Sequence, residues 1–245
     1  MSNINKFKIQ ELQYNFPYHY LVDFENFKSF KNLNWGIEYY AYINKVKELI
    51  LDIDYKNHLD IGCGDGKLIS IISKLNKEKQ HFGYDLSEPA ILLAKALNFN
   101  RKNATFVNGD FAEAEFEFDL ITLIEVLEHI PDAEIENFVE NIYKKLKPGG
   151  KLIVSLPSIN VFPVKAKHYR HYSLEMIKNS FSKFKFEKAY FLVKKGFIFK
   201  ANAIFSTLFP YSIMNKLQLK FAKKTLFTAN QNNCRHIICE FTKEN

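Results

Sequence analysis

Cysteine, tryptophan and methionine are rare in this chain, with 3, 1 and 3 residues among 245. The three cysteines, Cys63, Cys234 and Cys239, form no Cys-x-x-Cys pair and leave an odd one over. This pattern does not fit a disulfide framework and suits a reducing compartment. The segment after Met1 also lacks a basic start followed by an apolar run and a small-residue cleavage site. We therefore expect no signal peptide and a cytoplasmic protein.

Glycine is scarce as well, yet three of its nine residues stand at alternate positions in one short segment. An apolar stretch at residues 58–61, predicted as a strand, leads into Gly62, Gly64 and Gly66. Side chains at these positions would block the close approach of a ligand to the backbone. The helix predicted at 67–75 offers its N-terminal amides to the same ligand. The segment therefore predicts a cradle for a nucleotide-type cofactor.

An acidic residue, Asp85, follows the next predicted strand, 23 residues after Gly62. A carboxylate there can accept both hydrogen bonds of a ribose diol, but this spacing does not separate nicotinamide cofactors from other adenosine-bearing ones. The glycine pattern does separate them, because it is Gly-x-Gly-x-Gly rather than the Gly-x-Gly-x-x-Gly of pyrophosphate sites. Asp60 and Asp65 would also repel a pyrophosphate. A cationic or zwitterionic cofactor fits better.

These motifs resemble those of the class I S-adenosylmethionine-dependent methyltransferases. Further motifs follow in the family's order over about residues 55–160: Asn108-Gly109-Asp110-Phe111, the apolar run at 119–124, and Leu146-Lys147-Pro148-Gly149-Gly150. The resemblance implies S-adenosylmethionine as the cofactor. Carried over position by position, it implies these cofactor-binding residues: Asp60, Gly62, Cys63, Gly64, Asp85, Leu86, Asp110, Phe111 and Glu125.

Strand-like and helix-like periodicities alternate along the chain, which predicts a parallel sheet wrapped on both faces. The resemblance implies a doubly wound α/β, Rossmann-like sheet of seven strands with an antiparallel last strand. We expect strands at 58–61, 80–84, 104–107, 119–124, 151–156, 186–193 and 236–242, and helices at 39–51, 67–75, 88–97, 133–146 and 173–181. The predicted organisation is an N-terminal cap segment at 1–50, a methyltransferase core at 51–195, a helical insertion at 196–233 and the final strand at 234–245.

Methyl transfer makes limited demands on a protein, because the methyl group on a cationic sulfur is already activated and the main task is to orient the acceptor. An oxygen nucleophile that is not ionised also needs a general base, a role that suits histidine. His129, His168 and His171 follow the fourth and fifth predicted strands, where the family places its site. We expect methyl transfer to an oxygen or nitrogen of a small acceptor, with these histidines as candidate catalytic residues.

Other functions stay open. Glu125, Glu128 and His129, joined by a later histidine, resemble the metal-binding set of the small-RNA 3′-terminal 2′-O-methyltransferases. The first three of these residues lie in the run Glu-Val-Leu-Glu-His-Ile at 125–130, which also resembles the sequence in metal-free methyltransferases of quinone biosynthesis. In addition, Arg170-His171-Tyr172-Ser173 departs from the usual sequence of the RNA enzymes. We therefore predict no metal. A nicotinamide-dependent oxidoreductase and a non-catalytic domain that binds cofactor or lipid remain alternatives from other classes.

Positive charge is concentrated in the last third of the chain. Residues 159–245 hold 16 Lys and Arg against 4 Asp and Glu, and the whole chain has a net charge of +7. Such a region would attract an anionic partner, although it can also be a solvated surface that keeps the protein soluble. We expect the acceptor to be an anionic or lipid-linked small molecule and expect no nucleic-acid partner.

The predicted insertion reads as two amphipathic helices around Pro210, with lysines on their rims. It falls short of the ~20 consecutive apolar residues of a membrane span. It can act as a lid, as a dimer contact, or at 196–224 as an interfacial helix on anionic lipid. Its apolar residues are Phe197, Ala201, Ile204, Phe205, Leu208, Met214, Leu217 and Phe221. In the N-terminal cap segment, the candidates for covering the cofactor are Tyr14, Tyr18, His19 and Tyr20.

Overall fold

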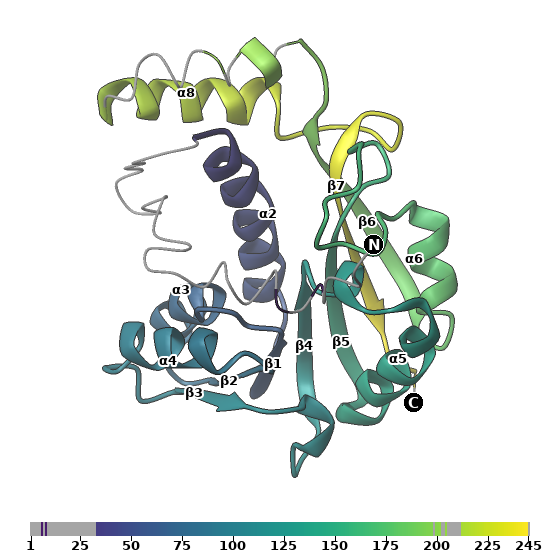
Figure 1. Ribbon diagram of the computed structural model, residues 1–245. Helices are drawn as coiled ribbons and strands as arrows, with labels where there is room; N and C mark the ends of the chain where they lie inside the picture. The colour runs from purple at the N-terminus through teal and green to yellow at the C-terminus, as the bar shows by residue number, and fades with distance from the viewer. Residues whose placement is uncertain are drawn as a thin grey trace.

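The computed structural model describes Lys6, Lys8 and residues 33–197, 199–201, 204 and 212–244. In this part of the chain, seven strands form one sheet in the order β3-β2-β1-β4-β5-β7-β6 (Figure 1). β7 runs antiparallel to both of its neighbours, and the other pairs are parallel. The predicted doubly wound sheet with an antiparallel last strand is therefore confirmed. The strands are β1 Asn57–Ile61, β2 Gln80–Asp85, β3 Ala104–Asn108, β4 Phe118–Ile124, β5 Leu146–Pro157, β6 Lys185–Lys194 and β7 Cys234–Thr242.

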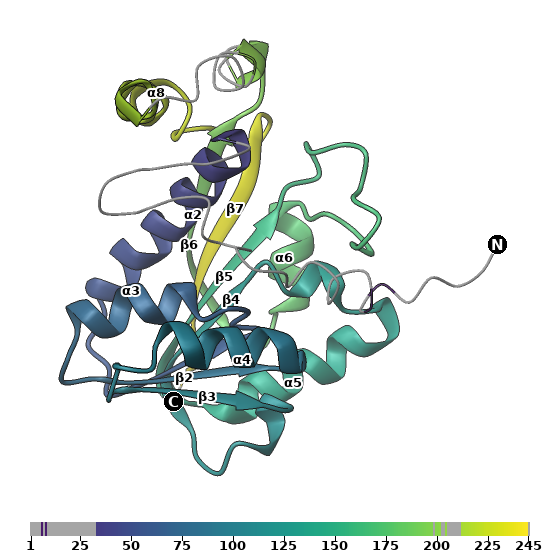
Figure 2. The same ribbon diagram turned by 60° about the vertical axis from the view of Figure 1, so that its left-hand side comes forward.

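Helices cover both faces of this sheet (Figures 1 and 2). On one face, Ile72 of α3 packs with Leu120 of β4 and with the apolar side of α2. On the other face, Val139 of α5 and Ile177 of α6 belong to the same core cluster as Ile121. Consecutive strand residues thus feed opposite layers of the core. The helices are α2 Leu33–Leu51, α3 Lys67–Leu75, α4 Glu88–Leu97, α5 Ile135–Lys145, α6 Leu174–Ser180 and α8 Ser212–Thr225.

Local sequence signals account for most helix boundaries. α4 begins after Ser87, whose hydroxyl accepts a hydrogen bond from the backbone N–H of Ala90, with a proline in the first turn. α6 begins after Ser173 in the same way. α5 begins later than predicted, because residues 132–134 form a 3₁₀ turn that precedes its first α-helical residue. Such turns are common at helix N-termini.

The apolar stripe predicted for the second insertion helix does not pack on the domain. Leu217 and Phe221 of α8 are 58% and 49% exposed. The helix instead buries Leu219, Ala222 and Leu226, which pack with Ile37 and Tyr40 of α2. These three residues are also spaced at i, i+3 and i+7, so one helix carries two apolar stripes, and contact with α2 selects the second.

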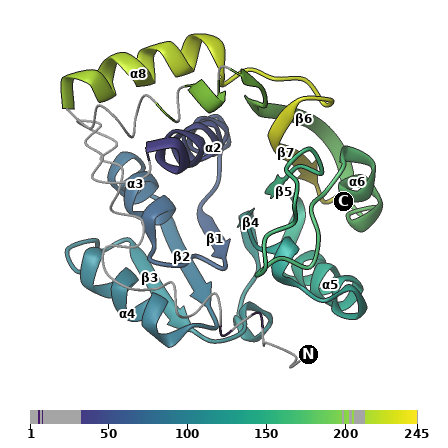
Figure 3. The same cartoon turned by 45° about the horizontal axis from the view of Figure 1, so that its top comes forward.

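Figure 3 shows α8 lying across the N-terminal end of α2, and the two helices are in contact. The insertion therefore packs on its own domain through α8. Of the predicted first insertion helix, Phe197 and Ile204 are largely exposed. Phe205 and Leu208 lie outside the described residues, as do the cap candidates Tyr14, Tyr18, His19 and Tyr20, and the side chain of Met214 is likewise not described. None of the helices in the described ranges has the length and apolar character needed to cross a bilayer.

Candidate functional site

The predicted cofactor residues line one cavity of about 680 Å³. We call it the central cavity. It opens at the carboxyl ends of β1, β2 and β4, the edge at which parallel α/β sheets bind their ligands. Residues at or after the ends of these strands and of β3 meet there: Asp60, Gly62, Cys63, Gly64, Asp85, Leu86, Asp110, Phe111 and Glu125.

The glycine loop of the central cavity needs glycine for steric reasons. Gly62 and Gly66 have φ angles of 66° and 73°, in the left-handed region that side chains disfavour. A Cβ atom on Gly62 would lie 2.5 Å from a methyl group of Val126, and one on Gly66 would lie 2.6 Å from the ring of Phe106. The loop therefore packs directly on neighbouring side chains, which leaves its other side bare toward the cavity.

Asp85 ties this loop to the end of β2. The backbone N–H of Gly64 donates to Asp85 Oδ2 over 2.9 Å, and the N–H of Ser87 donates to Asp85 Oδ1 over 2.9 Å. Burial raises the pKa of Asp85, and the two amide hydrogen bonds oppose this rise. Each carboxylate oxygen has a second lone pair. Asp85 can therefore hold the loop and still accept hydrogen bonds from a ligand.

A directed chain of hydrogen bonds ends on Asp60, which is buried. Thr122 Oγ1 donates to Asp60 Oδ1 over 2.6 Å, so the same hydroxyl accepts from Nε2 of His58, 2.8 Å away. Nδ1 of His58 is then an acceptor, and Nδ1 of His81, at 3.2 Å, must donate to it. Nε2 of His81 has no partner among the described residues. All the donors in the chain thus point toward Asp60.

The protonation states in this chain follow from burial. Burial raises the pKa of Asp60 to about 7, although the hydrogen bond from Thr122 lowers it. Burial also lowers the pKa of His81 to about 4 and that of His58 well below its usual range. Both histidines are therefore neutral at physiological pH. The sequence did not indicate these partners, because only strand pairing brings them together.

A buried ionic cluster lies beside Glu125. Nδ1 of His236 is 3.3 Å from Glu125 Oε1, and Nε2 is 2.7 Å from Glu38 Oε1. Burial lowers the pKa of His236, but the two carboxylates outweigh it and raise this pKa to about 9. Glu125 has a φ angle of 57°, which is unusual for a residue with a side chain. Since Glu38 lies on α2, the cluster links α2, β7 and the central cavity.

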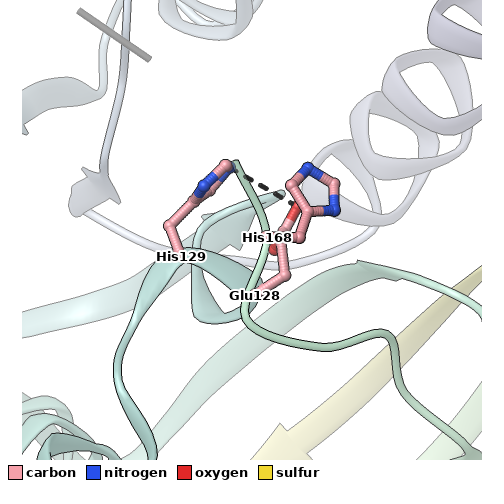
Figure 4. Close-up of side chains that lie close together, drawn as sticks. All are labelled: Glu128, His129 and His168. Carbon is pink, nitrogen blue, oxygen red and sulfur yellow. Dashed lines mark ion pairs between the residues drawn. The ribbon is translucent and has the colours of Figure 1, made fainter. Parts of the chain in front are cut away.

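The three candidate catalytic histidines lie together, but only two reach the central cavity. His129 and His168 line it together with Glu128, and Figure 4 shows these three side chains converging. His171 does not line the cavity, and its Nε2 lies 3.0 Å from Nδ1 of His168. Burial lowers the pKa of His129 to about 4 and that of His168 to about 2. Both rings are neutral at pH 7 and are weak bases.

Two groups of cavity residues were not predicted. Tyr39, Tyr42 and Ile43 of α2 line the cavity, and their positions at i, i+3 and i+4 were the available signal. Lys165 and Lys167, from the loop after β5, line the cavity near the histidines. The central cavity therefore has Asp60, Asp65 and Asp85 beside the glycine loop, followed by Lys67, and it has Lys165, Lys167 and Glu128 near His168.

Comparison with known proteins agrees with this geometry. Residues 59–152 match the family model described as a methyltransferase domain. The ubiquinone biosynthesis O-methyltransferase of Coxiella burnetii is 35% identical over 106 residues, which cover 41% of this chain and 43% of the relative. The trans-aconitate 2-methyltransferase of Deinococcus radiodurans is 30% identical over 113 residues, 46% of this chain and 42% of the relative. The chain thus matches less than half the length of these curated relatives.

Solved structures share the fold over nearly the whole chain. The N-methyltransferase NodS from Bradyrhizobium japonicum WM9, in complex with S-adenosyl-L-homocysteine, has a TM-score of 0.64 at 14% identity, covering 98% of this chain and 100% of its own. Magnesium protoporphyrin IX methyltransferase from Synechocystis PCC 6803, with bound S-adenosylmethionine, also has a TM-score of 0.64 at 14% identity and covers 100% of both chains.

The fold is that of the class I S-adenosylmethionine-dependent methyltransferases. Residues 59–152 are the part of this chain that matches the methyltransferase-domain model. The predicted resemblance and its cofactor, S-adenosylmethionine, are confirmed at the level of the family. The roles of the individual residues in the central cavity remain predictions.

Proposed function

We propose that this protein transfers the methyl group of S-adenosylmethionine to an oxygen atom of a small anionic acceptor. The proposal is carried by one observation: the nine family-matched residues line a single cavity whose other wall carries Lys165 and Lys167. Acidic groups suit a cofactor that carries an ammonium and a sulfonium charge. Basic groups suit a carboxylate or phosphate on the acceptor.

Each part of the cofactor can be assigned to residues that line the cavity. Asp60 would bind the aminoacyl end, Asp85 the ribose hydroxyls and Asp110 the adenine amino group. Leu86 is 63% exposed although it lines the cavity, so the adenine ring can cover it. Glu125 would lie near the sulfonium. When bound, S-adenosylmethionine supplies an activated methyl group, and the protein's main contribution is to orient the acceptor toward it.

The acceptor end supports an oxygen nucleophile. His129, which is partly exposed, and His168, which is buried, are both neutral there, so they can accept a hydrogen bond from a hydroxyl group. Their lowered pKa values make them poor general bases. His171 acts at most through His168. An acceptor with an acidic hydroxyl, such as a phenol that carries a carboxylate, fits these neutral imidazoles and the two lysines.

Curated relatives that carry the name ubiquinone biosynthesis O-methyltransferase support a lipid-linked form of this acceptor. A membrane contact through residues 196–224 would serve such a molecule. Leu217 and Phe221 face away from α2, and Lys220 and Lys224 are exposed on the same helix. Membrane contact and a homodimer both stay predictions.

Formation of S-adenosylhomocysteine from the purified chain, with a panel of hydroxyl and amine acceptors, tests the proposal. We expect turnover with hydroxylated anionic aromatics. Lys165→Ala combined with Lys167→Ala should raise KM for an anionic acceptor and leave cofactor affinity unchanged. Binding of S-adenosylmethionine without turnover on any acceptor would favour the non-catalytic alternative. Binding of NAD in its place would favour the oxidoreductase, and turnover with amines alone would contradict the oxygen acceptor.

A further inference from the structure

Glu128, His129 and His168 form a cluster at the acceptor end of the central cavity, and the proposed methyl transfer gives Glu128 no role. The ligand atoms that these residues offer lie within 4.8 Å of one another (Figure 4). Nε2 of His129 is 3.9 Å from Glu128 Oε1. The cluster lines the central cavity on the same side as Lys165 and Lys167. The hydrogen bonds around it decide which of these atoms carry protons.

The first free lone pair belongs to His129. Its Nδ1 lies 3.0 Å from the backbone carbonyl of Lys167. A carbonyl oxygen only accepts hydrogen bonds, so Nδ1 of His129 carries the proton. In the neutral ring, Nε2 then has a lone pair. A histidine held by its second nitrogen in this way is typical of metal ligands, whose ring orientation is fixed by such a contact.

The second lone pair belongs to His168 and follows from a two-step relay. Nδ1 of His171 lies 2.6 Å from the carbonyl oxygen of Val161, so it is a donor and Nε2 of His171 is an acceptor. Nδ1 of His168, 3.0 Å from that Nε2, must therefore donate to it. Nε2 of His168 is left with a lone pair. The relay gives His171 a positioning role through His168.

The third group is a carboxylate without a donor. Glu128 is 1% exposed, and neither of its side-chain oxygens has a hydrogen-bond partner in the described part of the chain. Buried polar atoms of this kind are rare and call for an unseen partner. Two nitrogen lone pairs and a carboxyl group thus face one another. Burial raises the pKa of Glu128 well above its usual range, so this carboxyl group keeps its proton until a bound cation displaces it. A cation placed among them would satisfy all three.

We propose that Glu128, His129 and His168 bind a divalent first-row transition-metal ion that holds the acceptor oxygen; this rests on the proposed function. Two imidazoles and one carboxylate form the donor set of catalytic Zn²⁺ sites, which keep a position open for substrate. The bound ion would lower the pKa of an acceptor hydroxyl, a task for which the neutral histidines are poor bases. The two nitrogen ligands disfavour Mg²⁺, which prefers oxygen ligands.

This site differs from the expectation drawn from the sequence. From the sequence we predict no metal, and the alternative metal-binding set that the sequence suggests includes Glu125. In the structure, Glu125 Oε1 faces His236 at 3.3 Å and Ser155 Oγ at 3.3 Å. Glu125 therefore belongs to a different cluster. The candidate site is a set of three residues, and it leaves Glu125 for the cofactor end.

Metal uptake can be measured without any acceptor. The full chain, stripped with a chelator, is titrated with Zn²⁺ by calorimetry and with Co²⁺ by visible absorption, with Mg²⁺ as the comparison. We expect one Zn²⁺ or Co²⁺ per chain and a Co²⁺ spectrum with nitrogen ligands. Glu128→Gln should weaken binding roughly tenfold or more. Glu134→Gln is the matched control, because this carboxylate also lines the cavity but lies outside the cluster, and it should bind as the parent does.

The outcomes separate this proposal from the proposed function. S-adenosylmethionine affinity, measured in the same preparations, should not change in Glu128→Gln; intact cofactor binding with no metal uptake overturns the metal site alone. Failure of the parent chain to bind Zn²⁺ or Co²⁺ overturns it whatever the variants do. Equal metal affinity of Glu128→Gln and the parent would place the ion elsewhere and would also overturn it.

Discussion

Replacing Thr122 with valine removes one hydroxyl group from the chain of hydrogen bonds that ends on Asp60. That hydroxyl donates to Asp60 Oδ1 over 2.6 Å and accepts from His58 Nε2 over 2.8 Å. The side chain is fully buried, and valine has nearly the same shape. The substitution therefore changes the polarity of the site and very little of its packing.

The expected effect on cofactor binding follows from the pKa of Asp60, which is about 7 in the parent chain. A hydrogen bond to a charged group is worth about 1.5–3 kcal/mol, which corresponds to about one to two pKa units. Without it, Asp60 is protonated at neutral pH and does not pair with the ammonium group of the cofactor. We expect affinity for S-adenosylhomocysteine to fall roughly 5- to 50-fold near pH 7, because about half of the Asp60 carboxyl groups are ionised there in the parent chain and about a tenth to a hundredth in the variant.

The protonation of Asp60 also makes both the folding stability and the cofactor affinity depend on pH, in opposite directions. Because the folded pKa of Asp60 is raised from 3.8 to about 7, the unbound protein loses stability as pH rises through this window. Cofactor affinity should rise over the same window, since binding uses the ionised carboxylate. In Thr122→Val this rise should move to higher pH.

Calorimetric titration with S-adenosylhomocysteine from about pH 6 to 9 measures both effects. Thr122→Ser is the control, because it keeps the hydroxyl and loses a methyl group. It should lose stability, yet bind the cofactor with nearly the parent affinity and pH profile. The reasoning is refuted if Thr122→Val binds as tightly as the parent with the same profile, or if serine impairs binding as much as valine.

Three further predictions follow from the cavity and its surroundings. Asp85→Ala should weaken cofactor binding at least about tenfold, because it removes hydrogen bonds to the ligand and strands two loop amides; unchanged affinity by calorimetry contradicts this. Gly66→Ala should lower the Tm, since its Cβ would lie 2.6 Å from a ring atom, whereas Gly109→Ala, with nothing within 4 Å, should not. His236, whose pKa is raised from 6.5 to about 9, should contribute stability that is complete below pH 6.5 and lost through about pH 9. The free energy of unfolding, measured with denaturant at each end of this pH range, should fall less in Glu38→Gln than in the parent chain.

The local parts of the fold could be predicted from the sequence. Helices α3 and α4 have the predicted limits, because apolar spacing, the serine cap and the proline are signals within each segment. The cavity residues also come together as expected. Their positions at the ends of neighbouring parallel strands suffice for this, since those ends meet at one edge of the sheet.

Contacts that depend on how neighbouring strands are aligned could not be predicted from the sequence patterns. His58 pairs with His81 across β1 and β2, and Asp60 pairs with Thr122 across β1 and β4. A slip of one residue would turn these side chains to opposite faces, and no local pattern fixes that register. His236 and Glu38 are 198 positions apart, so their ion pair depends on the docking of α2 on the finished sheet.

The strand order has a consequence for how the chain folds during synthesis. β6 lies at the edge of the sheet, and β7 is its only partner strand among the described residues, with a single bridge from Leu192 to Thr228 besides. β7 comes about forty residues later in the chain. A nascent chain that has emerged as far as β6 therefore has no template on which to dock this strand. It must keep an apolar ribbon unpaired until residues 234–242 leave the ribosome and complete the sheet between β5 and β6.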